Sequence, residues 1–391
     1  MNSQNTPVHI RLWHHDFWRM AFANLLLAMS VYMLIPTMPL WLLSSQHLSM
    51  TETGWVMGAF GVGLFLLGPF TSYLVQHFRR NMVCVWAVLL MIACLGAFYY
   101  LDGWLDHTGN LTLLLVLRVL LGAAFGLAQM VLASTLIIDT SESFQRTEAN
   151  HAASWFARFS LSLGPMAALI IGPKLGFPIV LLVSGGCALL AIILILLVHF
   201  PFRAPEEHVR SVSLDRFFLP HGFVLFVNLL LVTLAAGLVL SLPLTLQFYS
   251  MMMMGFLAAI LAQRFVFREA ELKSEVVSGL VLGIAALLMS LLRSQAVVGY
   301  VLPLFMGFAL GIIGSRFLLF FIKLSRHCQR GTSQSTYMLG WESGLAFGIG
   351  LGYAVFQTDR QQVLYTVFVL VVAALLLYQY THHWFLHHKN R

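Results

Sequence analysis

One basic turn between two apolar segments reads Gly68-Pro-Phe-Thr-Ser-Tyr-Leu-Val-Gln-His-Phe-Arg-Arg-Asn81. The apolar segment before it is rich in glycine, and the next apolar segment begins at once, at Met82. A connection this short predicts two antiparallel membrane spans, with Arg79 and Arg80 held at one membrane face. The turn has a counterpart later in the chain, because Ala259-Ile-Leu-Ala-Gln-Arg-Phe265 resembles Ser72-Tyr-Leu-Val-Gln-His-Phe78.

This similarity is part of an internal repeat. Three further matches occur in the same order: Phe22-Ala-Asn24-Leu-Leu-Leu27 with Phe226-Val-Asn228-Leu-Leu-Leu231, Gly122 and Gly126 with Gly307 and Gly311, and Trp155 and Gly164 with Trp341 and Gly350. Three of the four matches are separated by 185 to 187 residues. Each match alone is weak, but four in one order predict two like-oriented halves related by an axis along the membrane normal.

The composition excludes a soluble protein. Hydrophobic residues make up 59% of the chain and charged residues only 9%, whereas soluble domains carry about 25% charge. The start, Met1 to Asp16, is polar and lacks the features of a cleavable signal peptide. We therefore expect a multi-pass integral membrane protein in a bacterial-type inner membrane.

The net charge of +7 does not indicate nucleic-acid binding. Sixteen of the 22 lysines and arginines fall in segments on the side of the N-terminus, three fall on the other side, and three lie inside spans. This asymmetry follows the positive-inside rule and predicts that both termini are cytoplasmic.

A membrane-spanning helix needs about 20 apolar residues, and twelve segments qualify. They are Phe17–Leu43, Thr53–Val75, Met82–Leu101, Leu111–Ile138, Ala152–Leu175, Phe177–Phe200, His221–Leu242, Phe248–Phe267, Val276–Leu292, Val297–Ile322, Met338–Gln357 and Gln362–Tyr380. The predicted fold is an all-α membrane protein with twelve transmembrane helices in two six-helix, pseudo-symmetric bundles.

The polar segments divide the chain into five parts. We expect a cytoplasmic N-terminal tail (1–16), a first bundle (17–200), a cytoplasmic linker (201–220), a second bundle (221–380) and a cytoplasmic C-terminal tail (381–391). Prolines add local detail, since Pro36 and Pro39 predict a bend near the outer end of the first span. Gly164-Pro165 predicts a break in the fifth span.

Away from the ends of the predicted spans, four charged residues lie inside them: Arg118, Arg158, Arg316 and Glu342. Charges there are costly unless they face a cavity or a partner. Glu342 is the only carboxylate placed in a span, and a carboxyl group partly withdrawn from water can exchange a proton near neutral pH. Arg158 and Glu342 come from different halves, so they can pair across the interface. Alternatively, each charge is satisfied within its own half, and Arg118 and Arg316 extend to the membrane surface.

Charged loops suggest a gate on the cytoplasmic face. Asp139 and Glu142, which follow the fourth span, can pair with Arg79 and Arg80. Exposed pairs contribute only about 0–1 kcal/mol each, which suits a gate that has to open. The alternative is that these are solvated loop charges.

Twelve spans, two parallel halves, a central linker and the basic turns resemble the major facilitator superfamily over nearly the whole chain. Arg118-x-x-x-Gly122 resembles a motif of its fourth span, Pro36-x-x-Pro39 resembles its drug:proton antiporter branch, and Gly164-Pro165 resembles part of an antiporter motif. The chain departs from the basic-turn motif, where Gln76 takes the place of the usual acid.

The resemblance implies transport by alternating access around a central cavity lined by spans one, four, seven and ten. Polar residues of those spans, with two flanking charges, are the implied cavity residues: Asn24, Tyr32, Arg118, Gln129, Arg158, Asn228, Arg316 and Glu342. For Asn24 and Asn228 the alternative is a hydrogen bond between helices. Glu342 and Arg118 are the candidates for proton coupling.

The leading functional hypothesis is proton-coupled export of a small organic solute by a monomer in the bilayer. The alternatives are a proton-coupled uptake symporter for a nutrient or an anionic metabolite, and a non-transporting receptor or scaffold on the same fold. Three in-span arginines against one glutamate favour an anionic or zwitterionic substrate. We expect no enzyme activity and no cofactor, because the sequence contains no recognisable nucleotide-binding loop and no nucleophile–base arrangement. We expect no metal, because no spacing of the four cysteines suggests a metal site or a disulfide framework.

Overall fold

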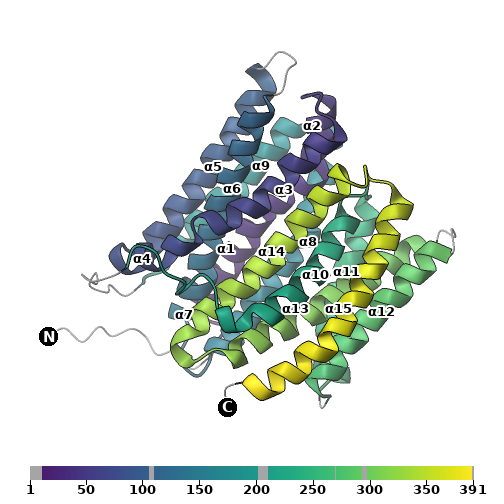
Figure 1. The fold of residues 1–391 in the computed structure, drawn as a ribbon. Coiled ribbons are helices and arrows are strands. Elements are labelled where there is room, and N and C mark those ends of the chain that lie inside the picture. The colour runs from purple at the N-terminus through teal and green to yellow at the C-terminus, as the bar shows by residue number, and fades with distance from the viewer. Residues whose placement is uncertain (1–10, 105–109, 201–209, 269, 293–296, 390–391) are drawn as a thin grey trace.

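The computed structural model describes residues 11–104, 110–200, 210–268, 270–292 and 297–389, and these residues form helices and short connections without a strand. The first half contains α1 (His15–Tyr32), α2 (Leu34–Ser44), α3 (Met50–Leu66), η1 (Gly68–Phe70), α4 (Thr71–His77), α5 (Arg80–Trp104), α6 (Leu111–Val131), η2 (Leu132–Leu136), α7 (Ile137–Asp139), α8 (Arg146–Leu175) and α9 (Phe177–Leu196). The second half contains η3 (Pro220–Gly222), α10 (Phe223–Leu240), α11 (Leu246–Leu261), η4 (Ala262–Val266), α12 (Leu272–Leu292), α13 (Val298–Leu324), η5 (His327–Gln329), α14 (Arg330–Ala354) and α15 (Arg360–His388). Figure 1 shows the two halves side by side.

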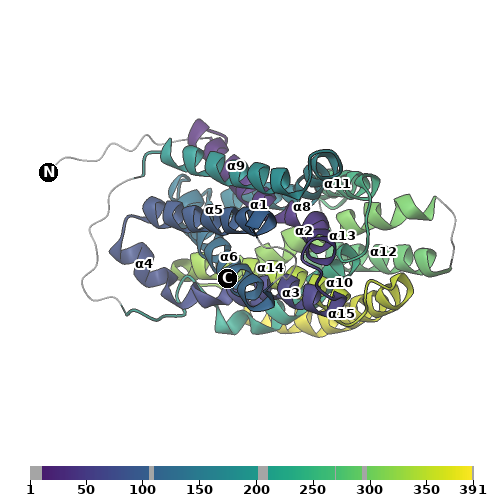
Figure 2. The same cartoon turned by 90° about the horizontal axis from the view of Figure 1, so that it is seen from above.

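The predicted all-helical membrane fold is confirmed. Among the described residues, eleven helical segments are long and apolar enough to span a membrane. The twelfth helix, α14, corresponds to the predicted span Met338–Gln357 and is long enough, at 25 residues. Serine, threonine and glycine residues lower its hydropathy. It lies between α3 and α10, in the middle of the molecule (Figures 1 and 2), so protein rather than lipid covers it.

Several boundaries differ from the predicted ones because helices continue through polar sequence. Helix α14 begins at Arg330, eight residues before the predicted span, and its polar first turns are buried. Helix α15 continues to His388 through most of the predicted C-terminal tail. Within the predicted linker 201–220, residues 201–209 lie outside the described residues, and residues 210–219 are described below.

Prolines act differently in the first and fifth spans. In the first span the helix assignment is interrupted at Met33, between α1 and α2, although Met33 keeps a helical conformation and its N–H bonds the carbonyl of Met29. Pro36 lacks the N–H that would bond the carbonyl of Tyr32, so the helix is weakened there. The predicted break at Gly164-Pro165 is wrong, because α8 runs without interruption from Arg146 to Leu175. Gly164 instead allows close approach, since a Cβ there would lie 3.1 Å from Cβ of Tyr32.

Glycines bring equivalent helices into backbone contact in both halves. In the first half α3 crosses α6, and a Cβ at Gly63 would lie 3.0 Å from Cα of Gly122. In the second half α11 crosses α13, and a Cβ at Gly255 would lie 3.0 Å from Cα of Gly307. Small residues at such crossings are typical of packed membrane helices, and their recurrence matches the repeat in the sequence.

The two ends of the bundle are different. We call the end at which α1 begins and α15 ends the terminal face, where α4 and α7 also lie, toward the lower left of Figure 1. At the opposite face α3 and α14 pack backbone to backbone, because a Cβ at Gly54 would lie 2.5 Å from the carbonyl oxygen of Gly350. At the terminal face a segment of the linker lies between the two halves.

Candidate functional site

A buried hydrogen bond joins the two halves between α1 and α14. The Tyr32 hydroxyl donates to Oε1 of Glu342 over 2.7 Å. Both residues are buried, with 3% and 4% of their surfaces exposed. Tyr32 is the last residue of α1, directly before the interruption at Met33. Glu342 lies midway along α14.

Of the two alternatives for Arg158, the structure shows no ion pair with Glu342, and Arg158 contacts residues of its own helix instead. Nη2 of Arg158 donates to the hydroxyl of Ser154 over 2.7 Å, and the guanidinium lies 4.5 Å from the ring centre of Trp155. Arg158 nevertheless reaches the second half, since a Cβ at Gly314 of α13 would lie 2.9 Å from its Nε. Serine and indole therefore take the place of the expected carboxylate partner.

A second polar contact between the halves was not predicted from the sequence. Nε2 of His151, in α8, lies 3.1 Å from the hydroxyl of Ser315, in α13. Gln263 donates to the same hydroxyl over 2.6 Å. The spacing of His151 with Trp155 and Arg158 places the three on one face of α8, but nothing in the sequence identifies serine as the partner.

Arg118 is buried without an ion-pair partner among the described residues. Its guanidinium lies 4.8 Å from the ring centre of Phe60 in α3, and its Nε and Nη1 have no hydrogen-bond partner there. Gln129, three helical turns further along, is also buried. A buried cation with unused donors is costly to maintain, so Arg118 is well suited to receive an anionic or polar group.

Arg316 does have a partner, inside its own half. Its Nε donates to Oε2 of Glu275 over 2.7 Å, and Nη2 lies 2.6 Å from the same oxygen. Glu275 is 1% exposed and lies in α12, which begins at Leu272, four residues before the predicted span. Glu342 is therefore not the only carboxylate in the spans, and this pair stabilises the packing of α12 on α13.

The two repeat-related asparagines make equivalent contacts. The amide of Asn24 donates to the carbonyl of Ala153 over 3.0 Å, and the amide of Asn228 donates to the carbonyl of Ala374 over 3.1 Å. Each bond joins two helices of one half. Both side-chain oxygens are buried and lack partners among the described residues.

The terminal face contains part of the expected gate. Arg80 forms an ion pair with Asp139 at the end of α7. Both residues belong to the first half, so this pair does not itself join the halves. Glu142 forms no ion pair with another described residue, and Arg79 is exposed.

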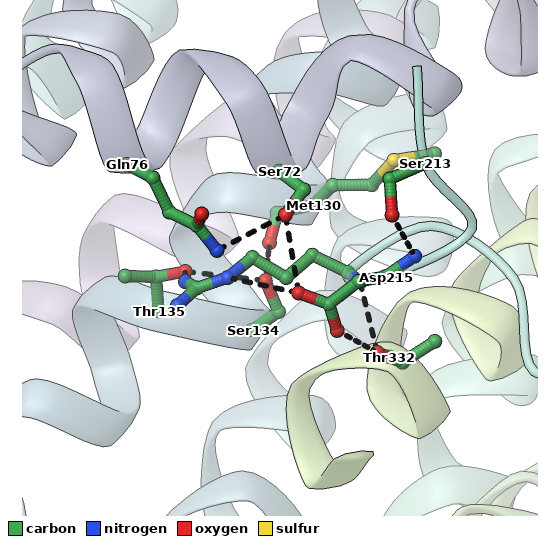
Figure 3. Close-up of polar contacts among 9 residues, drawn as sticks. Ser72, Gln76, Met130, Ser134, Thr135, Ser213, Asp215 and Thr332 are labelled. Carbon is green, nitrogen blue, oxygen red and sulfur yellow. Dashed lines mark hydrogen bonds and ion pairs between the residues drawn. The ribbon is translucent and has the colours of Figure 1, made fainter. Parts of the chain in front are cut away.

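The linker, rather than this ion pair, connects the halves at the terminal face (Figure 3). Ser72 of α4 donates to Oδ2 of Asp215 over 3.1 Å, and Thr332 of α14 donates to Oδ1 over 3.0 Å. One carboxylate thus accepts hydrogen bonds from both halves. Gln76, which stands where the family's motif has an acid, donates to Ser72 over 3.2 Å.

The next linker residue strengthens the same connection. The N–H of Arg216 donates to the hydroxyl of Thr332 over 2.8 Å, and Nη1 donates to Thr135 of η2 over 2.9 Å. Arg216 has φ of 56°, a left-handed conformation that is strained for arginine and persists only where surrounding contacts hold it. We refer to residues 213–219, with Ser72, Thr135 and Thr332, as the linker junction.

Apolar packing anchors the linker junction to the first half. Phe217 is buried and its ring packs edge-on against Phe65, with ring centres 6.4 Å apart. Gly68, in the turn quoted first, leaves the space that this ring occupies. The N–H of Ser213 donates to the carbonyl of Pro69 over 2.9 Å.

A cavity of about 240 Å³ lies beside the linker junction on the terminal face. Its charged lining residues come from both halves and from the linker: Arg80, Asp139, Arg146, Asp215, Arg216 and Arg330. Cys328 and Asn150 also line it. The sequence connected only Arg80 and Asp139 with each other, and it gave no sign that the remaining lining residues share a cavity.

Comparison with solved structures identifies several proteins with a similar fold. The chain resembles, at 18% identity and a TM-score of 0.64, a bacterial homologue of the iron transporter ferroportin in an outward-facing state, over 93% of this chain and 98% of that one. It resembles the human organic anion transporter TETRAN at 16% identity and a TM-score of 0.65, over 92% and 98% of the two chains. The nucleoside transporter NupG matches at 13% identity and a TM-score of 0.64, over 93% and 99%.

At such identities these likenesses show the fold alone. No curated protein sequence matches the chain. The family model described as Major Facilitator Superfamily matches residues 20–349, which is most of the chain. This multi-pass integral membrane protein, with its two repeated helical bundles, belongs to the Major Facilitator Superfamily of transporters.

Proposed function

We propose that the chain is a secondary active transporter that exports a small organic solute in exchange for protons, as a monomer in the inner membrane with both termini in the cytoplasm. The observation that carries this proposal is the Tyr32–Glu342 hydrogen bond, which joins the two halves through a buried carboxyl group. Halves that rock against each other have to break this bond, so the bond can link movement to protonation.

Glu342 has the properties that proton coupling requires. It is 4% exposed and forms no ion pair with another described residue. A buried carboxyl group without a cation can be neutral, and its charge then changes when water or solute reaches it. The bond to Tyr32 gives the carboxyl group a different environment in the closed and open arrangements.

The substrate side of the proposal rests on Arg118. Its buried guanidinium has two nitrogen atoms without partners in the described structure, so an anionic or zwitterionic solute would gain a charged hydrogen bond there. Asn24 and Asn228, with their unpaired oxygens, are further proposed contacts, as are Gln129, Arg158 and Arg316. An uptake symporter for an anionic metabolite uses the same residues, and it is the second candidate.

The gate on the terminal face is proposed to include the linker junction. Arg79, Arg80, Asp139 and Glu142 remain its charged surroundings, whereas Asp215 makes the hydrogen bonds that span the halves. Opening this face requires the carboxylate to release Ser72, Thr332 or both.

The test is transport in liposomes with an imposed pH gradient. The lumenal pH is followed while pools of metabolites and lipophilic compounds are supplied, and the direction of the gradient separates export from uptake. Substrate-dependent proton movement is expected from the native chain and is expected to be absent from Glu342→Gln. Coupled proton movement that survives this substitution would contradict the role of Glu342.

Tyr32→Phe is the matched control. It removes the hydrogen bond but keeps the carboxyl group, so proton coupling is expected to weaken, with a changed pH dependence, but not to vanish as in Glu342→Gln. Arg118→Gln is expected to weaken substrate affinity while substrate-independent proton leak stays unchanged. Absence of coupled flux with every pool would reject the proposal in favour of a receptor or another coupling ion.

A further inference from the structure

The geometry points to a binding site for a phosphate-class dianion in the cavity beside the linker junction, held between Arg146 of the first half and Arg330 of the second. The site follows from the charges and the packing of the terminal face, and it does not depend on the proposed transport reaction.

The cavity holds an excess of positive charge. Four arginines and two aspartates line it, which leaves two positive charges without a counterpart. Arg80 pairs with Asp139, and Arg216 bonds Thr135 and lies 3.9 Å from Asp215. Arg146 and Arg330 have no acidic partner among the described residues.

These two arginines hold equivalent places in the repeat. Arg146 is the first residue of α8 and Arg330 is the first residue of α14. They are 184 residues apart, close to the 185 to 187 residues that separate the sequence matches. The cavity therefore receives one guanidinium from the same position of each half, and a ligand between them would touch both halves.

The surroundings add donors for an anion. The partial positive charge of a helix N-terminus favours a nearby anion, and neither α8 nor α14 has a side-chain cap at its first turn. Nε of Arg146 is buried without a partner in the described structure. The hydroxyl-bearing Thr147 lines the same cavity.

Charge and volume define the ligand class. Two uncompensated guanidinium groups match one dianion, and guanidinium forms paired hydrogen bonds with phosphate oxygens. The cavity volume of about 240 Å³ leaves room for phosphate or a small phosphate monoester. Because its arginines come from both halves, the bound anion would hold the terminal face closed.

Cys328 provides a natural reporter for this site. Its thiol is exposed and lines the cavity, whereas Cys84 and Cys94 are buried and Cys187 lies elsewhere, in α9. The experiment measures the rate at which a maleimide labels Cys328 in the purified full-length protein, with Cys328→Ser as the background. Inorganic phosphate is compared with sodium chloride at equal ionic strength.

We expect phosphate to slow labelling of Cys328 about tenfold in a saturable manner, while chloride and the labelling of Cys187 show no such effect. The double substitution Arg146→Gln with Arg330→Gln is expected to abolish the protection. The charge-matched control is Lys174→Gln with Arg360→Gln, which removes two exposed cations away from the cavity and is expected to keep the protection. If chloride and phosphate slowed the labelling of Cys328 in the native chain equally, that result alone would overturn the proposal.

A lysine pair, Arg146→Lys with Arg330→Lys, covers the case in which the glutamine pair does not fold. It keeps the charge and is expected to show weakened protection, whereas undiminished protection in a folded variant of either pair would overturn the assignment. Two sources of the anion are distinguished with the protein in phosphatidylcholine nanodiscs, in buffer without free phosphate. One set of nanodiscs also contains phosphatidic acid and the other does not. Protection by phosphatidic acid assigns the site to a lipid phosphate monoester, and protection by free phosphate alone assigns it to a soluble one.

Discussion

The contacts between the two halves are built from different chemistry at the opposite face and at the terminal face. At the opposite face Gly54 and Gly58 lie against Gly350 and Ala354, and backbone meets backbone without a polar side chain between them. At the terminal face the halves are joined through Asp215 of the linker junction, although α14 also packs on η2 there, since a Cβ at Gly331 would lie 3.0 Å from the carbonyl oxygen of Ser134. Dispersion between close backbones is lost steeply with small displacements, whereas hydrogen bonds to a half-exposed carboxylate can exchange with water. This difference indicates that the terminal face is the end that opens more readily.

The largest expected effect on stability comes from adding one methyl group to a glycine at the opposite face. Gly54→Ala places a Cβ 2.5 Å from the carbonyl oxygen of Gly350, so α3 and α14 have to separate. We expect a loss of about 1–3 kcal/mol of stability, measured as a lower thermal unfolding midpoint. Gly58→Ala is the matched control, because its Cβ would meet Cα of Gly350 at an ordinary 3.6 Å. Equal midpoints for the two variants would refute the description of a backbone-to-backbone contact.

A substitution in the linker junction at the terminal face is expected to change the conformation of the protein more than its stability. Asp215→Ala removes the acceptor of two hydrogen bonds, but the side chain is 45% exposed, so we expect about 1 kcal/mol or less of lost stability. A change of that size still alters the balance of closed and open forms severalfold. The measurement is maleimide labelling of Cys328, which should become faster in Asp215→Ala. Unchanged labelling would mean that the carboxylate does not hold the terminal face closed.

A last pair of substitutions isolates the strain at Arg216. Glycine accepts a φ of 56° and alanine does not, so Arg216→Gly should be more stable than Arg216→Ala by about 1 kcal/mol. Both variants lose the bond to Thr135 equally, and their difference in unfolding midpoint reports the backbone alone. A more stable alanine variant would show that the left-handed conformation is not present in solution.

The membrane spans were predictable from the sequence, because an apolar run of about 20 residues fits the thickness of a bilayer. The start of α14 was predicted eight residues late, because Thr332 to Tyr337 have the composition of a polar loop although they are buried. A hydropathy profile cannot show that these polar residues are covered by other helices rather than exposed in a loop. Glu275 was missed for a similar reason, since its partner Arg316 is distant in sequence and α12 begins in a polar segment.

The candidate site was predictable in its residues but not in its partners. Tyr32, Arg158 and Glu342 were each identified, and a pair of Arg158 with Glu342 was one of two alternatives. In the structure the Tyr32 hydroxyl bonds the carboxyl group of Glu342 instead. The linker junction was not predicted at all, because Asp215 and Thr332 are 117 residues apart and no periodic pattern relates them.

The most direct test of the difference between the two ends is a pair of distances measured by pulsed electron paramagnetic resonance. Spin labels at exposed positions of the two halves, His77 with Arg326 at the terminal face and Thr51 with Val355 at the opposite face, are compared in the native chain and in Asp215→Ala, with Cys187 and Cys328 replaced by serine. We predict that Asp215→Ala lengthens and broadens the first distance and leaves the second unchanged. A longer distance at the opposite face, or no change at either, would contradict a terminal face held closed by Asp215.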